Sequence, residues 1–192
     1  MNTIKIANTK YNVHELFKNR WSALSYSDKP LHDEEILTMI EAASWSFSSS
    51  NVQPWRFIYA LKGSETFQKI LDTLMPGNVT WAKNAAAFVV GIAKTTLDRE
   101  GNPLNGAAEL DLGSAYMLLI LQALTMKIYA HPMGGFDKTK LSTTFELEQN
   151  LKPMVVIALG YLDAAEKLND PYLTRELSPR TRKPLNEIIL KQ

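Results

Sequence analysis

Apolar residues along this chain recur at helical spacing in some segments and form short continuous runs in others. The helical spacing predicts helices over residues 14–18, 31–45, 64–75, 106–127 and 137–147, with a last helical turn starting at 184–185. The runs predict strands over residues 55–61, 86–93, 128–131 and 154–162. Because helices and strands are interspersed, without repeats or linkers, we expect one mixed α/β domain over residues 1–192.

Three of these segments have features of their own. Residues 86–93 are apolar throughout, which is typical of a strand buried on both faces. The fifteen uncharged residues from Leu112 to Met126 are fewer than the roughly 20 needed to cross a bilayer, so we expect a buried helix. Pro76 and Gly77 are expected to end the helix before them. Residues 163–183 have little core-forming pattern, so a partner subunit could hold them.

Composition and charge exclude several classes of protein. The 45% hydrophobic and 21% charged residues are ordinary for a globular domain. A net charge of +1 argues against nucleic acid as a partner. The absence of cysteine excludes disulfides, thiolate nucleophiles and iron–sulfur clusters. The first residues lack an apolar signal-peptide core, so we expect a cytoplasmic protein without a membrane segment.

Hydrolytic and metal sites are not indicated. No GxSxG elbow and no HExxH spacing occurs. The three histidines are far apart: His14 and His32 are expected to be solvated, and His131 to be structural. We therefore predict no metal ligands and no serine triad.

A polar junction at residues 48–55 lies between a predicted helix and a predicted strand. Ser48, Ser50, Asn51 and Gln53 offer hydroxyl and amide groups to whatever lies beside them. A loop that caps the helix and turns at Pro54 is the simpler interpretation.

Basic residues and a glycine pair could bind a phosphorylated, flat ligand. Arg20 lies two residues before Ser22, and Arg180 two residues before Arg182, a spacing that puts side chains on one side of an extended segment. Guanidinium groups suit a terminal phosphate, although solvated surface arginines remain an alternative. The adjacent Gly134 and Gly135 allow close backbone approach to a ligand, or simply form a turn. Without GxGxxG, a Rossmann site is not indicated.

In this order the elements resemble the nitroreductase family of FMN-dependent oxidoreductases. The matching elements are RxS at 20–22, SxxNxQPW at 48–55, a PxxGFD-like element at 132–137 and RxRxPL at 180–185. The similarity extends from about residue 16 to 190, which is essentially the whole chain.

The resemblance implies an α+β fold, a three-layer α/β/α sandwich with a central, mainly antiparallel sheet. It also implies an intertwined homodimer with FMN at the subunit interface, in which residues 163–192 wrap the partner. Ser50 would reach the partner's cofactor, and the backbone at Gly134 and Gly135 would face flavin N5. The implied FMN-binding residues are Arg20, Trp21, Ser22, Ser48, Ser50, Asn51, Gln53, Pro132, Met133, Gly134, Gly135, Arg180 and Arg182.

Two departures from the family pattern affect these expectations. Trp21 and Leu24 stand where the family usually has basic residues. The basic residue at the position of Leu24 normally approaches the polar edge of the flavin, so the reduced flavin should be less stable here unless a residue such as Lys83 compensates. Phe47 replaces the usual proline and could narrow the pocket, alone or with neighbouring tryptophans. We expect Trp45 to be an ordinary core residue.

The predicted function is hydride transfer from NAD(P)H, through FMN, to a small electron acceptor such as a quinone or nitroaromatic compound. One alternative is a flavin-binding or storage protein without efficient turnover. Another is a specialised flavin enzyme on the same scaffold, such as a dehalogenase or ring oxidase. A non-flavin α/β binding module would require the four matching elements to be coincidental.

Overall fold

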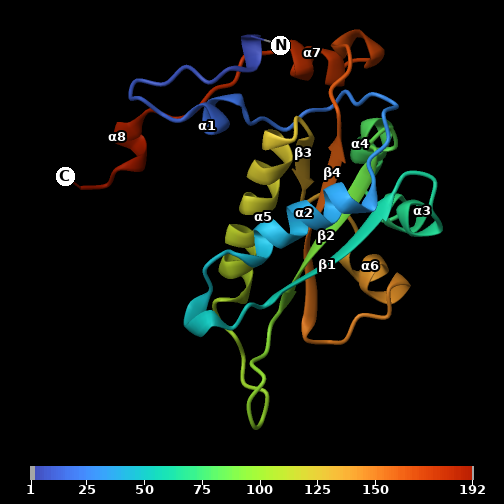
Figure 1. Cartoon of the computed structure of the whole chain (residues 1–192), viewed down its shortest axis with the longest axis vertical. Helices are drawn as coiled ribbons and strands as arrows, with labels where there is room; N and C mark the ends of the chain where they lie inside the picture. The colour runs from blue at the N-terminus through green and yellow to red at the C-terminus, as the bar shows by residue number, and fades with distance from the viewer. Residues whose placement is uncertain (1–2, 192) are drawn as a thin grey trace.

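The computed structural model describes residues 3–191, so residues 1, 2 and 192 of the predicted domain lie outside the described residues. Its centre is a four-stranded antiparallel sheet with the strand order β1-β2-β4-β3 (Figure 1). The strands are β1 (Trp55–Leu61), β2 (Ala87–Lys94), β3 (Tyr129–Met133) and β4 (Leu151–Gly160). All four predicted strands are therefore present.

Helices cover both faces of the sheet and make two hydrophobic cores. Successive residues of β2 and β4 point to opposite faces, so Phe88 and Val156 lie in one core while Val89 and Ile157 lie in the other. The helices α2 (Asp33–Ser44) and α5 (Ala108–Thr125) close the second core. The first is closed by α3 (Glu65–Leu71), α4 (Pro76–Ala82) and α6 (Lys138–Thr144). The predicted three-layer α/β/α architecture is confirmed.

The inner strand β2 is buried along almost its whole length, as its continuous apolar sequence predicts. Its pairing with β4 shifts register between Gly91 and Ile92, where Pro153 takes part in the ladder. Pro132 lies inside β3, which therefore extends further than the predicted strand at 128–131. A proline is tolerated there because β3 is an edge strand.

The remaining helices are short: α1 (Glu15–Asn19), α7 (Tyr172–Leu177) and α8 (Leu185–Ile188). Some helices differ from prediction. The helix predicted over residues 64–75 ends at Leu71, so Pro76 and Gly77 do not end it. Pro76 instead begins α4, because proline is well suited to the first helical position. α7 lies in a segment whose sequence shows little helical pattern.

Trp45 was expected in the core, and that expectation is wrong. α2 ends at Ser44, and the Trp45 side chain is 82% exposed. Phe47 is exposed as well, whereas Trp21 and Trp81 are buried. Within residues 3–191, no helix combines the length and the apolarity that crossing a membrane requires, α5 included.

Candidate functional site

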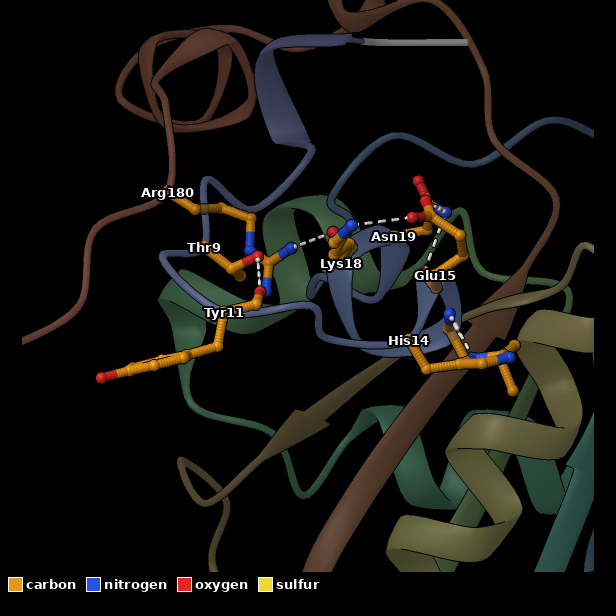
Figure 2. A network of polar contacts seen from close by, with 8 residues as sticks. Thr9, Tyr11, His14, Glu15, Lys18, Asn19 and Arg180 are labelled. Atoms are coloured by element: carbon orange, nitrogen blue, oxygen red, sulfur yellow. Dashed lines mark hydrogen bonds and ion pairs between the residues drawn. The ribbon is translucent and has the colours of Figure 1, made fainter. Parts of the chain in front are cut away.

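Three arginines from distant parts of the chain meet beside α1. Arg20 follows directly after α1 and is half-buried. Arg180 reaches from the C-terminal segment to α1, where its guanidinium donates to the carbonyl oxygen of Lys18 at 2.6 Å (Figure 2). It also donates to the carbonyl oxygen of Lys5 at 3.1 Å. Arg182 is exposed and donates to the neighbouring carbonyl of Thr181 at 2.6 Å. We call Arg20, Arg180 and Arg182 the arginine cluster.

The charges of the arginine cluster oppose one another. Burial lowers the pKa of Arg20, and the positive charges of Arg180 and Arg182 lower it further. The pKa of Arg180 is lowered by burial and by Arg182. Across residues 3–191, no carboxylate forms an ion pair with any of the three. Uncompensated guanidinium groups at one place are suited to a phosphate or another anion.

In the segment after Arg20, some side chains are buried in the core and others are partly exposed. Trp21 is buried, packs against Tyr129 with ring centroids 4.5 Å apart, and donates from its ring nitrogen to Glu176. The indole of Trp21 therefore lies in the core, and only its backbone is left to contact a ligand. Ser22 is partly exposed, two residues from Arg20. Leu24 is buried and offers no polar group, and Lys83 is exposed at the end of α4.

The polar junction forms a loop with an unusual backbone. Ser50, Asn51 and Gln53 have φ angles of 52°, 54° and 52°, in the left-handed region that non-glycine residues seldom adopt. Such conformations cost of order 1–3 kcal/mol each and are concentrated at functional sites. The carboxylate of Asp111, on the first turn of α5, accepts a hydrogen bond from the Ser49 amide at 3.2 Å. Asp111 therefore anchors the strained loop to α5.

Hydrogen bonds inside the loop use some of its polar groups. The Ser48 hydroxyl accepts from the Gln53 amide at 3.0 Å, and the Gln53 side chain donates to Asn51. Ser50 is exposed. The loop lies near the first turn of α5, whereas α1 lies beside the last turns of α5 (Figure 1). The arginine cluster is on the side of α1, because Arg20 follows this helix and Arg180 binds its Lys18 carbonyl. The 18 residues of α5 span about 27 Å, so one chain does not bring its own loop to its own cluster.

The glycine pair follows β3 directly. The Gly135 carbonyl accepts from the Met75 amide at 3.0 Å and from the Asn78 side chain at 2.9 Å. In the described part of the chain, neither glycine amide donates a backbone hydrogen bond. An added Cβ at Gly134 would meet nothing within 4 Å, so the backbone is open to a ligand there.

A pocket adjoins this open backbone. It has a volume of about 320 Å³ and is lined by Pro132, Gly134 and side chains of α5 and β4. Met133 points away from it into the core. The turn thus presents free amides beside a hollow, whose lining on the helical side includes Gly113 and Tyr116.

His131 has a structural position, as predicted. Its Nδ1 donates to the Ala23 carbonyl at 2.9 Å, and its ring packs against Trp81 with centroids 4.4 Å apart. Sequence patterns did not indicate the supporting roles of Asp111 or Glu176. An acidic residue in the first turn of a helix is common, and nothing in the sequence near Glu176 predicts its burial.

The nitroreductase family model matches residues 17–161 of this chain. A protein of Xanthomonas oryzae, provisionally named an NADH dehydrogenase/NAD(P)H nitroreductase, is 27% identical over 80% of this chain and 86% of its own length. A solved structure described as an oxidoreductase containing FMN superposes with a TM-score of 0.92. It is 33% identical and covers 96% of this chain and 93% of its own.

A nitroreductase-family structure from Streptococcus pneumoniae has the same fold. It superposes with a TM-score of 0.74 at 24% identity, covering 93% of this chain and 98% of its own. The family model covers about three quarters of the chain, and the superposition on the FMN-containing oxidoreductase extends the similarity to 96% of it. The chain belongs to the nitroreductase family.

Proposed function

We propose that this protein is an FMN-dependent oxidoreductase. It takes hydride from NADH or NADPH and reduces a flat electron acceptor such as a quinone or a nitroaromatic compound. The observation that carries the proposal is the arginine cluster, whose charges repel one another and meet no carboxylate partner among residues 3–191. A terminal phosphate dianion would neutralise it, with several charge-assisted hydrogen bonds.

The other groups of the site are suited to the rest of FMN. Ser22, two residues after Arg20, would add a hydroxyl at the phosphate end. The free amides of Gly134 and Gly135 and the adjacent hollow would face the ring system. Bound FMN supplies the redox chemistry, because its rings accept a hydride and pass the electrons on. The residues of this chain therefore need to bind and orient two flat molecules, and no acid–base pair is required.

We propose a homodimer as the functional unit. Four large apolar side chains, Trp45, Phe47, Leu110 and Met117, are exposed around a groove of about 680 Å³ between α5 and the end of α2. Exposed apolar surface of this kind is typical of an interface between proteins. In the dimer, a second copy covers the groove, and the loop at residues 48–53 completes the partner's site. The C-terminal segment from residue 163 would wrap that partner.

The visible spectrum of the purified protein tests the proposal. The expected result is a yellow protein that NADPH or NADH bleaches without oxygen and that a benzoquinone or a nitrobenzene reoxidises. Light scattering should give the molar mass of two chains. A colourless protein that cannot be loaded with FMN would refute the proposal.

One observation favours a second candidate, a flavin binder without efficient turnover. The apolar Leu24 side chain is buried and uncharged, and it brings no positive charge to the polar edge of the flavin. A reduced, anionic flavin would then be less stabilised. A yellow protein that neither NADPH nor NADH bleaches would identify this candidate.

A further inference from the structure

A buried carboxylate lies under the segment that carries Arg20 and Ser22. Glu176, on α7, is only 4% exposed. Its two oxygens accept from the backbone amide of Leu24 at 3.1 Å and from the ring nitrogen of Trp21 at 3.3 Å. One side chain thus holds two points of a segment that belongs to no helix and to no strand of the sheet.

The charge of Glu176 is costly where it lies. Burial raises the pKa of its carboxyl group, against the hydrogen bonds and positive charges that favour the ionised form. Within residues 3–191 no cation forms an ion pair with it. A buried carboxylate without an ion-pair partner contributes little to the stability of a fold, so its presence suggests a purpose other than stability.

Lys5 lies nearby but bonds elsewhere. Lys5 is only 6% exposed, and its ammonium group donates to the carbonyl oxygens of Arg175 and Ser178, both at 2.7 Å. These carbonyls are at the C-terminal end of α7, so Lys5 fixes the helix that carries Glu176. The Lys5 carbonyl in turn accepts from Arg180. The contacts of Lys5 therefore join α7 to Arg180. The contacts of Glu176 join α7 to the segment that follows Arg20.

We propose that Glu176 is a positioning residue for the arginine cluster. It holds residues 21–24 so that Arg20 and Ser22 keep their places opposite Arg180 and Arg182 before the phosphate arrives. Holding the cluster in place beforehand avoids the cost of bringing three like charges together during binding. This inference rests on the proposed function and names a determinant of its phosphate end.

The test compares two ligands that differ only in the phosphate. Glu176→Gln keeps the size of the side chain. Its NH₂ group cannot accept a hydrogen bond, so the Trp21 ring nitrogen or the Leu24 amide loses its acceptor. We expect it to weaken FMN binding at least about tenfold, because a hydrogen bond to a charged group is lost. Riboflavin, which has no phosphate, should bind the variant within about twofold of the parent. Flavin fluorescence on titration into the apoprotein measures both, and Glu187→Gln, on exposed α8, is the matched control.

The affinities of Glu176→Gln for the two ligands decide whether the inference holds. Unchanged FMN affinity, or equal losses of affinity for FMN and riboflavin, would overturn the inference, since a merely structural role has no preference for the phosphate. If circular dichroism shows that Glu176→Gln is unfolded, Lys5→Met replaces it, because methionine keeps most of the apolar stem and removes the bonds to α7. The same selective loss of FMN is expected, and its absence refutes the inference. Failure of the parent to bind FMN would refute the proposed function instead.

Discussion

The largely buried imidazole of His131 should make the stability of the fold depend on pH. Burial lowers the pKa of His131 from 6.5 to about 4; its bond to the Ala23 carbonyl opposes this shift, and the charges of Arg175 and Arg20 add to it. The ring is mostly enclosed, by Trp81 on one side, so little solvent screens the effect. The folded protein therefore keeps this histidine neutral at pH values where the unfolded chain protonates it.

The sign and size follow from proton linkage. Between the unfolded pKa of 6.5 and the folded pKa of about 4, the unfolded chain binds more protons, so stability falls as the pH falls through this window. At 1.36 kcal/mol per pKa unit, the lowered pKa changes the free energy of unfolding by about 3 kcal/mol once the pH is below both pKa values. Of this, about 2 kcal/mol should already be lost at about pH 5 relative to about pH 7.5.

Urea unfolding of the parent and of His131→Gln at these two pH values measures the effect. Glutamine can still donate to the Ala23 carbonyl but does not titrate, and it loses the ring contact with Trp81. We expect the variant to be less stable than the parent near neutral pH and to lose about 2 kcal/mol less on acidification. Carboxylates that titrate in both proteins cancel in this difference. Equal losses in the two proteins would show that His131 does not titrate as its surroundings require.

Other substitutions address the backbone and the anion. Gly134→Ala should leave the melting temperature unchanged but weaken FMN binding, whereas Gly135→Ala should lower the melting temperature, because its Cβ would lie 2.8 Å from a side-chain atom. Calorimetry measures the melting temperatures and flavin titration measures FMN binding. Equal melting temperatures for the two variants would contradict this account. Ser50→Gly should stabilise the protein by about 0.5–1 kcal/mol, because glycine adopts φ 52° without strain; urea unfolding that shows no gain would argue against strain. Arg182→Ala should weaken FMN binding by about 1.5–3 kcal/mol, with Arg99→Ala as an exposed control, and unchanged flavin content would refute its phosphate role.

The strands were predictable because their signals are local. Trp55–Leu61 is bounded as its apolar run predicts, and the uninterrupted apolar sequence of β2 already indicates a strand covered on both faces. α5 has the bounds expected for its long apolar stretch to within two residues. Such elements depend on the burial of their own side chains, which the sequence shows directly.

Other features depend on contacts between distant residues, and the sequence does not show these. α7 has a weak apolar pattern, and it is held from outside by Lys5, which is 170 residues from Arg175. Trp45 lies one residue past a helix end, where the chain turns outward, so its apolar character did not indicate burial. The positions of the arginines in sequence suggested a shared ligand, but only the fold brings Arg20 to Arg180.

The distance between the loop at residues 48–53 and the arginine cluster, at opposite ends of α5, has a consequence for handling the protein. In the proposed arrangement a flavin is a ligand of a pair of chains, not of one. Retention of the flavin then follows mass action in protein as well as in cofactor, so dilution that separates the chains also releases FMN. A stock solution would keep its flavin bound, whereas the same protein, diluted for assay, would lose FMN to the solvent with the kinetics of subunit dissociation.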